Sequence, residues 1–356
     1  MYPYFLSLLL VIISILLCRQ KGHIQLAFLS CFIWLVLFAG LRDEGVDRDY
    51  NVYIQGYYDV SSPIEEYFDG RASFVNEPAI NIIASVSKYF FDSTIVFFLV
   101  FSFLGVGLKF LSIRKYSPFL LLSVLIYFSK YYFFNEFTQI RMGVAVGFFL
   151  FSIQYIVSRN LLKFLSLIFI GGLFHYSVLL VIPLYFLSAT AINVKLYLAA
   201  VLAAMMLAIM KFDVVAMLSI LDLGSLVQRY NDYTIILDVG RPNIFGPLIL
   251  YQLFFILFFL FNIERIRYRS EYVIILTKIY VLSLVVFYIF SSNSMLALRF
   301  KELFGIVEIV LLPFAMFLFK PRWLFISILM FSSVLVFLGC IYFIKLVRNY
   351  SMVFNF

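Results

Sequence analysis

The chain is 356 residues long, 64% hydrophobic and only 13% charged, with 45 Phe and 25 Tyr. A soluble domain is roughly 45–50% apolar, so this composition excludes a soluble globular enzyme. The net charge of +8 does not indicate nucleic-acid binding, because no stripe of Lys and Arg interleaved with aromatic residues lies on a soluble segment. Apolar runs of about 20 residues, long enough to cross a hydrocarbon core about 30 Å thick, recur along the chain. We therefore predict an all-α polytopic membrane protein.

These apolar runs predict about 12 transmembrane helices in a single integral membrane domain, residues 1–356. The first run lacks a basic n-region and a cleavage pattern of small residues, so we expect a retained helix and not a signal peptide. Residues 162–175 and 176–188 are short, and form either one broken helix or a tight hairpin. The predicted spans are 3–18, 24–41, 94–113, 118–134, 138–157, 162–175, 176–188, 195–211, 245–263, 272–291, 302–319 and 323–345.

Residues 78–91 are apolar but carry Asn81, Ser85, Ser87 and Lys88. Counting them as a full span would break the alternation of charged loops along the chain. We expect a re-entrant or interfacial segment.

The short loops fall into two alternating sets, of which one is small and basic. By the positive-inside rule these loops face the cytoplasm. The other set, with both chain ends and the long loops 42–77 and 212–244, then faces outward. Of 19 Asp and Glu, only Glu264 and Glu271 lie in or beside the basic loops. This asymmetry suggests a polar cavity open to the outer side, because polar groups at membrane depth need protein or water partners.

The first charged cluster is "GLRDEGVDRDYNVY", residues 40–53, which continues at Glu77 and Pro78. Tyrosine rings stack on sugar faces and carboxylates accept hydrogen bonds from hydroxyl groups. The candidate residues are Arg42, Asp47, Asp49, Tyr50, Tyr53 and Glu77. A solvated loop whose charges pair with one another is an equal alternative.

The second cluster is "FFNEFTQIRMGVAV", residues 133–146, at an outward helix end. Arg141 is backed by small residues, which let neighbouring helices approach closely and favour an orientation toward the bundle. The guanidinium fork fits phosphate oxygens. Asn135 and Gln139 are one turn apart and are further candidates. The alternative is an interfacial anchor that extends outward.

His175 falls inside an apolar run directly after Gly171 and Gly172, in "GGLFHYSVLLVIP". The Gly–Gly pair and the polar residue suggest a break in the helix that would place His175 in a cavity. Histidine acts as a general base near neutral pH. A structural histidine is the alternative reading.

The long segment 212–247 has apolar residues at helical spacing in its first half, which suits a helix on the membrane surface. Arg229, Tyr230, Tyr233 and Arg241 could form a lid that binds anions and sugars. A plain amphipathic connector is the alternative.

A last cluster lies in "NSMLALRFKELFGIVEIV", residues 293–310. Arg299 and Glu302 are spaced for an internal ion pair. Glu308 lies deeper, and an intramembrane carboxylate is a functional candidate. A structural ion pair is the alternative.

Neither a metal site nor any other cofactor is expected. The three cysteines lie in apolar stretches without a CxxC pair, and no convincing nucleotide or metalloprotease motif occurs.

Several stretches together resemble the EpsG / O-antigen polymerase (Wzy) family. They are "GLRDEGVDRDYNVY", "NEPAINII", the run from "FNEFTQIRMGVAVGFFLFSIQYI" to "KFLSLIFIGGLFHYSVLLVIPLYFL", and "LALRFKELFG". The resemblance implies a GT-C-like glycosyltransferase in the bacterial inner membrane with its active site facing the periplasm. Its substrates would be an undecaprenyl-pyrophosphate-linked glycan and a second lipid-linked repeat. A chain-length regulator protein is a further expected partner.

The resemblance also implies roles for residues. Arg42, Arg141 and Arg299 would stabilise the pyrophosphate, with Arg229 and Arg241 in support. His175 or a loop carboxylate, among them Asp47, Asp49 and Glu77, would be the base. Arg48 interrupts the family's usual glycine–aspartate–tyrosine pattern, so the choice between Asp47 and Asp49 stays open. An O-antigen ligase or a flippase or transporter of lipid-linked oligosaccharide is the alternative function.

Overall fold

The computed structural model describes residues 1–18, 20–59, 77–214 and 240–352. Within these ranges the chain is helical, and the only β pairing is two isolated bridges, Arg42 with Met352 and Asp47 with Val347. The all-α prediction is confirmed for this part of the chain.

Five helices in the described part are long and apolar enough to cross a membrane. They are α2 (Lys21–Gly40), α6 (Thr94–Tyr116), α8 (Ile140–Val157), Pro247–Arg269 with α13, and Arg322–Phe343 with α17. Six shorter apolar helices accompany them, which are Tyr2–Leu17, Leu120–Tyr131, Leu161–Phe174, Tyr176–Phe186, Val194–Ile209 and Val273–Ile289. The protein is thus a multi-pass membrane protein, whereas the full number of about 12 spans stays a prediction.

The chain divides into two compact units. Unit 1 comprises Met1–Phe186 and Phe319–Phe356, and unit 2 comprises Leu187–Leu318. The single domain expected for residues 1–356 stays a prediction, and each unit is described by itself.

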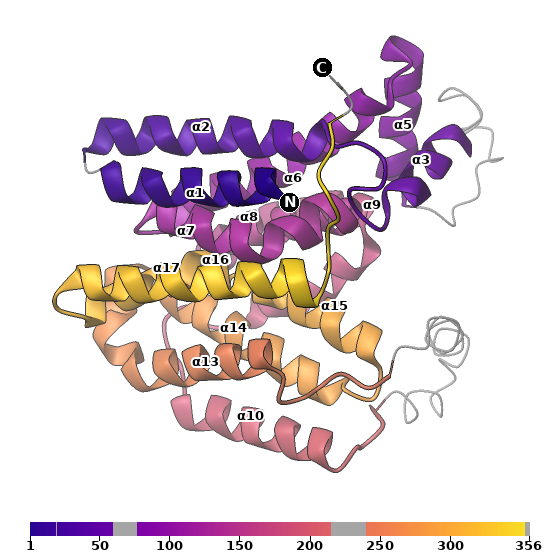
Figure 1. The fold of residues 1–356 in the computed structure, drawn as a ribbon. Coiled ribbons are helices and arrows are strands. Elements are labelled where there is room, and N and C mark those ends of the chain that lie inside the picture. The colour runs from indigo at the N-terminus through magenta and orange to yellow at the C-terminus, as the bar shows by residue number, and fades with distance from the viewer. Residues whose placement is uncertain (19, 60–76, 215–239, 353–356) are drawn as a thin grey trace. The chain divides into compact units, whose positions relative to one another are not determined.

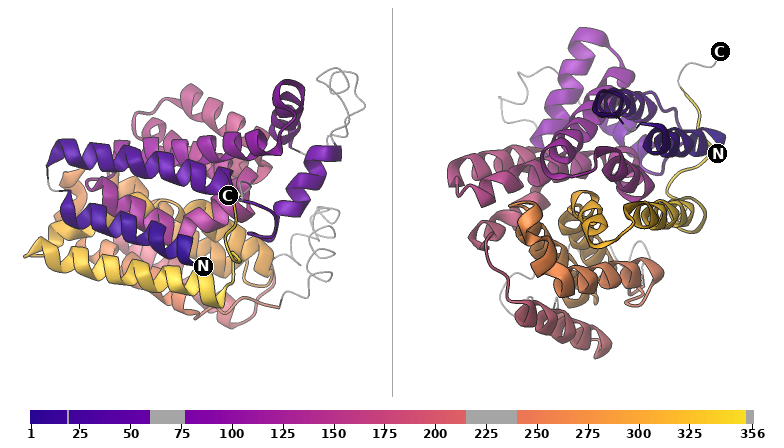
Figure 2. Two further views of the ribbon diagram at one scale, coloured as in Figure 1. Left: turned by 45° about the horizontal axis from the view of Figure 1, so that its top comes forward. Right: turned by 90° about the vertical axis from the view of Figure 1, so that its left-hand side faces the viewer.

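In unit 1, α1 (Tyr2–Leu17), α2 and α17 (Arg322–Leu338) run side by side, as Figure 1 shows along their length and the right-hand view of Figure 2 shows end on. Aromatic side chains fill the space between them, with Phe5 against Phe337 at 5.4 Å between ring centroids. Helix α6 packs between α2 and α8, and α8 packs against α9 (Leu161–Phe174). Apolar surface on nearly every side suits these helices to a bilayer.

The end of the chain crosses back over unit 1. After α17 it runs to the end of α2, visible as the yellow segment in Figure 1, where Asp43 N–H donates to the Ser351 carbonyl at 3.0 Å and Arg348 N–H to the Val46 carbonyl at 2.8 Å. The Tyr350 ring stacks on Phe38 at 4.2 Å. The connection 41–49 is therefore a structured loop held by the C-terminal segment.

The predicted span 118–134 is helical but unevenly wound. It consists of α7 (Leu120–Ile126) and two wide π-helical turns, η1 (Tyr127–Tyr131) and η2 (Phe133–Thr138). Helical winding therefore continues through Thr138, and only Gln139, with φ −116° and ψ 57°, separates it from α8. Asn135 thus lies in a π turn and Gln139 at the break, so their expected spacing of one α-helical turn stays a prediction.

The glycine pair before His175 ends a helix, as expected. Helix α9 stops at Phe174, His175 is extended with φ −158° and ψ 118°, and the 3₁₀ helix η3 (Tyr176–Phe186) follows. Gly172 lies so close to Leu179 that a Cβ there would be 3.1 Å from its Cδ2. Side chains seven residues apart touch only if the chain turns back, so the hairpin alternative describes residues 162–188.

Unit 2 contains α10 (Val194–Ile209), α13 (Pro247–Ile266), α14 (Val273–Ile289), α15 (Ser294–Gly305), α16 (Glu308–Leu311) and η5 (Leu312–Leu318). Helix α14 is its centre and contacts α10, α13 and α15. The predicted span 302–319 consists of the end of α15, α16 and η5, and its insertion into a membrane stays a prediction. Asn293 caps α15 by accepting from Leu296 N–H at 3.1 Å, and that helix ends at Gly305.

The described residues between α2 and α6 include two helices. Helix α3 (Tyr50–Asp59) was not expected, and α5 (Pro78–Phe91) occupies the segment predicted to be re-entrant or interfacial. The insertion of α5 into a membrane stays a prediction. Most of the amphipathic helix predicted after residue 212 lies outside the described residues.

Candidate functional site: a carboxylate between an arginine and a histidine

The Glu77 carboxylate contacts two side chains, those of Arg141 and His175. Its Oε2 pairs with the Arg141 guanidinium, and its Oε1 lies 2.6 Å from His175 Nδ1. The Glu77 side chain is 9% exposed, His175 19% and Arg141 31%, so the carboxylate is covered while both partners reach open space. The three residues come from separate predicted clusters, and the structure brings them together.

Local structure explains the position of each of the three. Glu77 is the N-cap of α5 with Pro78 in the first turn, where a fixed φ suits the helix start and a negative charge suits the helix dipole. Arg141 lies in the first turn of α8, directly after the break at Gln139. His175 occupies the extended residue between α9 and η3. All three are at helix ends, where side chains can point toward a shared space.

The charge of Glu77 is stabilised in this setting. Burial by itself would raise the pKa of its carboxyl, but the hydrogen bond with His175 and the positive charge of Arg141 outweigh burial and hold the pKa below its usual value. Glu77 is therefore a carboxylate at neutral pH. No described residue bonds Nε2 of His175, which leaves that nitrogen open to a substrate.

Tyr53 lies beside Arg141 and is the fourth residue of the site. Its hydroxyl donates to the Thr138 carbonyl at 3.1 Å, and its ring centroid lies 5.9 Å from the Arg141 guanidinium carbon. Burial raises the pKa of Tyr53 to about 12, so it remains a neutral donor. The aromatic ring, the cation and the carboxylate thus form one cluster, the Glu77 site: Tyr53, Glu77, Arg141 and His175.

Arg42 and Asp47 form a buried pair of their own. Arg42 Nε donates to Asp47 Oδ2 at 2.7 Å, and neither side chain is exposed. Its other nitrogens donate to the carbonyls of Ala39 at 2.6 Å and Phe137 at 3.2 Å. The Phe98 ring covers the guanidinium at 4.4 Å. Arg42 and Asp47 therefore fasten the loop after α2, and their predicted substrate and catalytic roles stay untested.

Asp49 ends the same loop, and Tyr50 begins α3. Asp49 N–H donates to Asp47 Oδ1 at 3.0 Å, and the Tyr50 ring stacks on Phe98 at 4.9 Å. Asp49 is half-buried and Tyr50 is buried.

Asn135 and Gln139 flank the break before α8. Asn135 is buried, and its Nδ2 has no hydrogen-bond partner among the described residues. Gln139 is half-buried and is itself the non-helical residue of the break.

Sequence reasoning missed a second buried ion pair, Lys109 with Glu136. Tyr127 O–H donates to the same carboxylate at 2.8 Å. Lys109 stands inside an apolar run, where a charge was the signal that could have identified it, whereas Glu136 lies between the predicted spans 118–134 and 138–157.

The candidates of unit 2 are placed within that unit alone. Arg241 is exposed and donates to the Lys211 carbonyl at 3.4 Å. Arg299 and Glu302 are half-buried on α15, and Glu308 is buried at the start of α16. Arg229, Tyr230 and Tyr233 lie outside the described residues.

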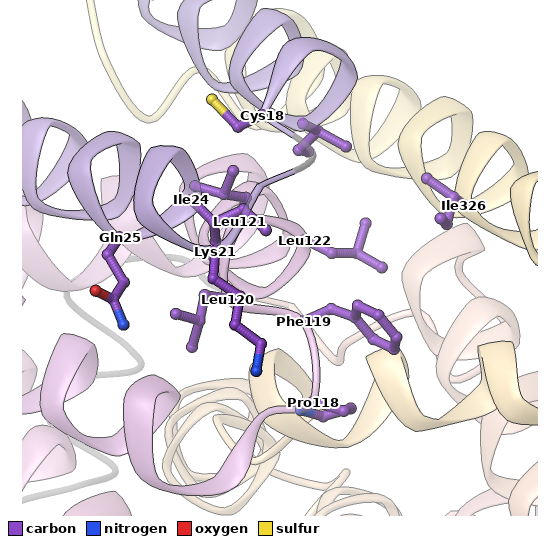
Figure 3. Close-up of a pocket in the computed structure, with 11 residues that line it drawn as sticks. Cys18, Lys21, Ile24, Gln25, Pro118, Phe119, Leu120, Leu121, Leu122 and Ile326 are labelled. Carbon is purple, nitrogen blue, oxygen red and sulfur yellow. The ribbon is translucent and has the colours of Figure 1, made fainter.

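A cavity of about 370 Å³ lies at the opposite end of α2 from the Arg42 loop (Figure 3). Cys18, Lys21 and Gln25 line it together with apolar residues of the α6–α7 connection, and it contains none of the Glu77 site residues. Within the described ranges, no three His, Cys, Asp or Glu side chains are grouped to hold a metal ion.

The fold and this cluster define the class: a multi-pass helical membrane protein with a partly buried carboxylate–histidine–arginine site. The chain belongs to the EpsG family, which it matches over residues 24–356. It is also similar to the amylovoran biosynthesis protein AmsC of Erwinia amylovora, with 28% identity over 176 residues that cover 48% of this chain and 46% of AmsC. The match thus spans about half the length of this curated relative. No solved structure matches the chain.

Proposed function

We propose that this protein is a polysaccharide polymerase, a membrane glycosyltransferase that moves a growing glycan from undecaprenyl pyrophosphate onto a lipid-linked repeat unit at the periplasmic face. Family membership and the name of its relative AmsC, a biosynthesis protein for amylovoran, support a role in making exopolysaccharide. The observation that carries the proposal is the Glu77 carboxylate shared between His175 and Arg141.

His175 is the proposed base. With Nδ1 held by Glu77, its Nε2 is aimed away from the carboxylate, and the negative charge stabilises the imidazolium that forms when Nε2 accepts a proton. The acceptor hydroxyl oxygen attacks the anomeric carbon of the donor while its proton passes to Nε2. The bond from that carbon to the pyrophosphate oxygen breaks, and the carrier pyrophosphate leaves with the electron pair.

Arg141 is the proposed phosphate ligand. Nearly a third of its side chain is exposed, and its guanidinium fork matches phosphate oxygens bidentately. Negative charge builds on the leaving pyrophosphate, where a preorganised cation lowers the barrier. Tyr53 offers an aromatic face beside that cation.

The exposure of Arg141 and His175 beside the covered Glu77 carboxylate favours chemistry over a purely structural role. A structural ion pair needs only one cation for one carboxylate, whereas here two partners share Glu77 and both remain accessible. Such a constellation in a membrane protein is a functional candidate.

The decisive experiment is gene deletion followed by analysis of the surface glycan. A polymerase defect leaves glycan capped at a single repeat, and complementation with the wild-type chain restores the long polymer. A ligase defect would leave no repeats attached to their final acceptor. A transporter defect would leave lipid-linked repeats on the cytoplasmic leaflet. Either of the last two results would replace the polymerase proposal with the corresponding alternative.

A further inference from the structure

Lys109 and Glu136 form a buried ion pair that the proposed chemistry does not use. The exposed fraction is 0% for the Lys109 side chain and 1% for that of Glu136. Burying two charges is expensive, and a pair of apolar residues of similar volume is often as stable or more stable. The pair therefore needs an explanation other than stability.

Its bonds cross the break in front of Arg141. Lys109, from α6, donates to Glu136 on η2 and to the Gly143 carbonyl on α8 at 2.8 Å. The third ammonium donor reaches the Gly105 carbonyl at 3.3 Å. A lysine has three donors, so all are used, and one ammonium group joins the last π turn to the first turn of the next helix.

Two glycines make this arrangement possible. A Cβ on Gly105 would collide with the Glu136 carboxylate, and a Cβ on Gly143 would collide with the Asn135 carbonyl. The π turn and α8 are therefore in backbone contact across Gln139. Backbone hydrogen bonds continue on either side of the break, from Gln139 N–H to Phe134 at 2.8 Å and from Gly143 N–H to Gln139 at 2.7 Å.

Arg141 lies inside the segment that these contacts hold. It is two residues before Gly143 and two after Gln139, so the direction of its side chain depends on where the first turn of α8 begins. A shift of about 1 Å at such a position is enough to misplace a reacting group.

We propose that Lys109 and Glu136 are positioning residues, which fix the break at Gln139 and thereby direct Arg141 toward Glu77. π turns inside helices are frequent at functional sites, which agrees with a role in setting the direction of one side chain. The effect on polymerisation rests on the proposed function, whereas the effect on the placement of Arg141 does not.

The first test measures Arg141 itself. The purified full chain in detergent is treated with phenylglyoxal, and modification of Arg141 is followed by mass spectrometry. In Lys109→Met we expect modification to be severalfold faster, because Arg141 is no longer held against Glu77. Lys115→Met, the same change at an exposed position of α6, should leave the rate unchanged. An unchanged Arg141 rate in folded Lys109→Met overturns the proposal.

Two further variants separate positioning from folding. Lys109→Met with Glu136→Leu leaves no buried charge unpaired, so we expect normal yield but continued fast modification of Arg141. If Arg141 in this double variant is modified at the wild-type rate, the ion pair only balances charge and the proposal is overturned. Gly143→Ala should expose Arg141 without removing a charge, with Gly107→Ala as control, since its Cβ would meet nothing closer than 3.8 Å.

The glycan readout then separates this inference from the proposed function. Suppose that the deletion strain lacks long polymer and that labelling shows Arg141 mispositioned in the double variant. The double variant should then also fail to restore long polymer in the deletion strain. If deletion leaves polymer length unchanged, the proposed function fails while the labelling result still decides the positioning role.

Discussion

Glu77 and His175, 98 positions apart in the chain, are joined by a 2.6 Å hydrogen bond from the start of α5 to the break after α9. The bond sets the ring orientation and leaves Nε2 open, which is the arrangement a general base requires. Variants of these two residues, of Arg141 and of the Arg42–Asp47 pair test the arrangement.

Replacing His175 by Asn should abolish most polymerisation. General base catalysis contributes about 10²- to 10⁴-fold to a rate, so we expect a loss of that order. The measurement is polymer formation from the native lipid-linked repeat by the purified variant. His23→Asn changes the other histidine, which is exposed at the start of α2, and should keep wild-type activity. Equal activity of both variants would rule out His175 as the base.

Replacing Arg141 by Lys keeps the charge but loses the guanidinium fork. We expect at least about a tenfold loss in turnover, because a point charge cannot match two phosphate oxygens at once. The same change at exposed Arg114 on α6 is the control. Undiminished polymerisation by Arg141→Lys would contradict the bidentate role.

Replacing Glu77 by Gln should destabilise the protein in a pH-dependent way. The folded protein lowers the pKa of Glu77, so this carboxylate stabilises the fold above about pH 4.3, the value for an unfolded glutamate, and the stabilisation is lost as pH falls through the lower folded pKa. The difference in unfolding free energy between wild type and Glu77→Gln should be about 1–3 kcal/mol at neutral pH and shrink under acid.

Thermal unfolding in detergent between pH 3 and 7 measures this difference. Glu44→Gln, at an exposed position of the loop after α2, serves as the control and should show no such trend. A Glu77→Gln difference that is constant with pH would show that the carboxylate charge contributes nothing.

Replacing Arg42 by Met should mainly lower stability, because it leaves Asp47 buried without its partner. Breaking a buried ion pair costs about 3–5 kcal/mol, and removing both charges in Arg42→Met with Asp47→Leu should recover most of that loss. Arg48→Met, at an exposed arginine of the same loop, is the control. The measurement is yield and melting temperature in detergent. Full stability of Arg42→Met with loss of polymerisation alone would instead support the substrate role predicted for Arg42.

Individual residues show which parts of the candidate site could be predicted from the sequence. Arg141 and His175 were identified because a charge or a histidine in an apolar run is rare and stands out. Glu77 was identified as a candidate carboxylate in the continuation of the first charged cluster. Lys109 was equally visible as a charge in an apolar run, yet nothing local identifies Glu136, 27 positions away, as its partner.

The breaks were harder to predict than the helices. The Gly171–Gly172 pair marks the end of α9, but no residue type marks the π turns before Gln139, because their winding follows from the packing of α6 and α8 around Glu136. The end of α15 at Gly305 likewise lies within the short apolar stretch between Glu302 and Glu308, which contains no other mark of a helix end.

The sequence by itself determined that this is a multi-pass helical membrane protein, since apolar run length is a local property that the bilayer requires. It also determined which few charged residues needed an explanation. Only the tertiary structure decided that Glu77 joins Arg141 to His175, that Arg42 is enclosed with Asp47, and that Lys109 spans the break before α8. Pairing between distant segments depends on how helices pack, and no local pattern of residues encodes it.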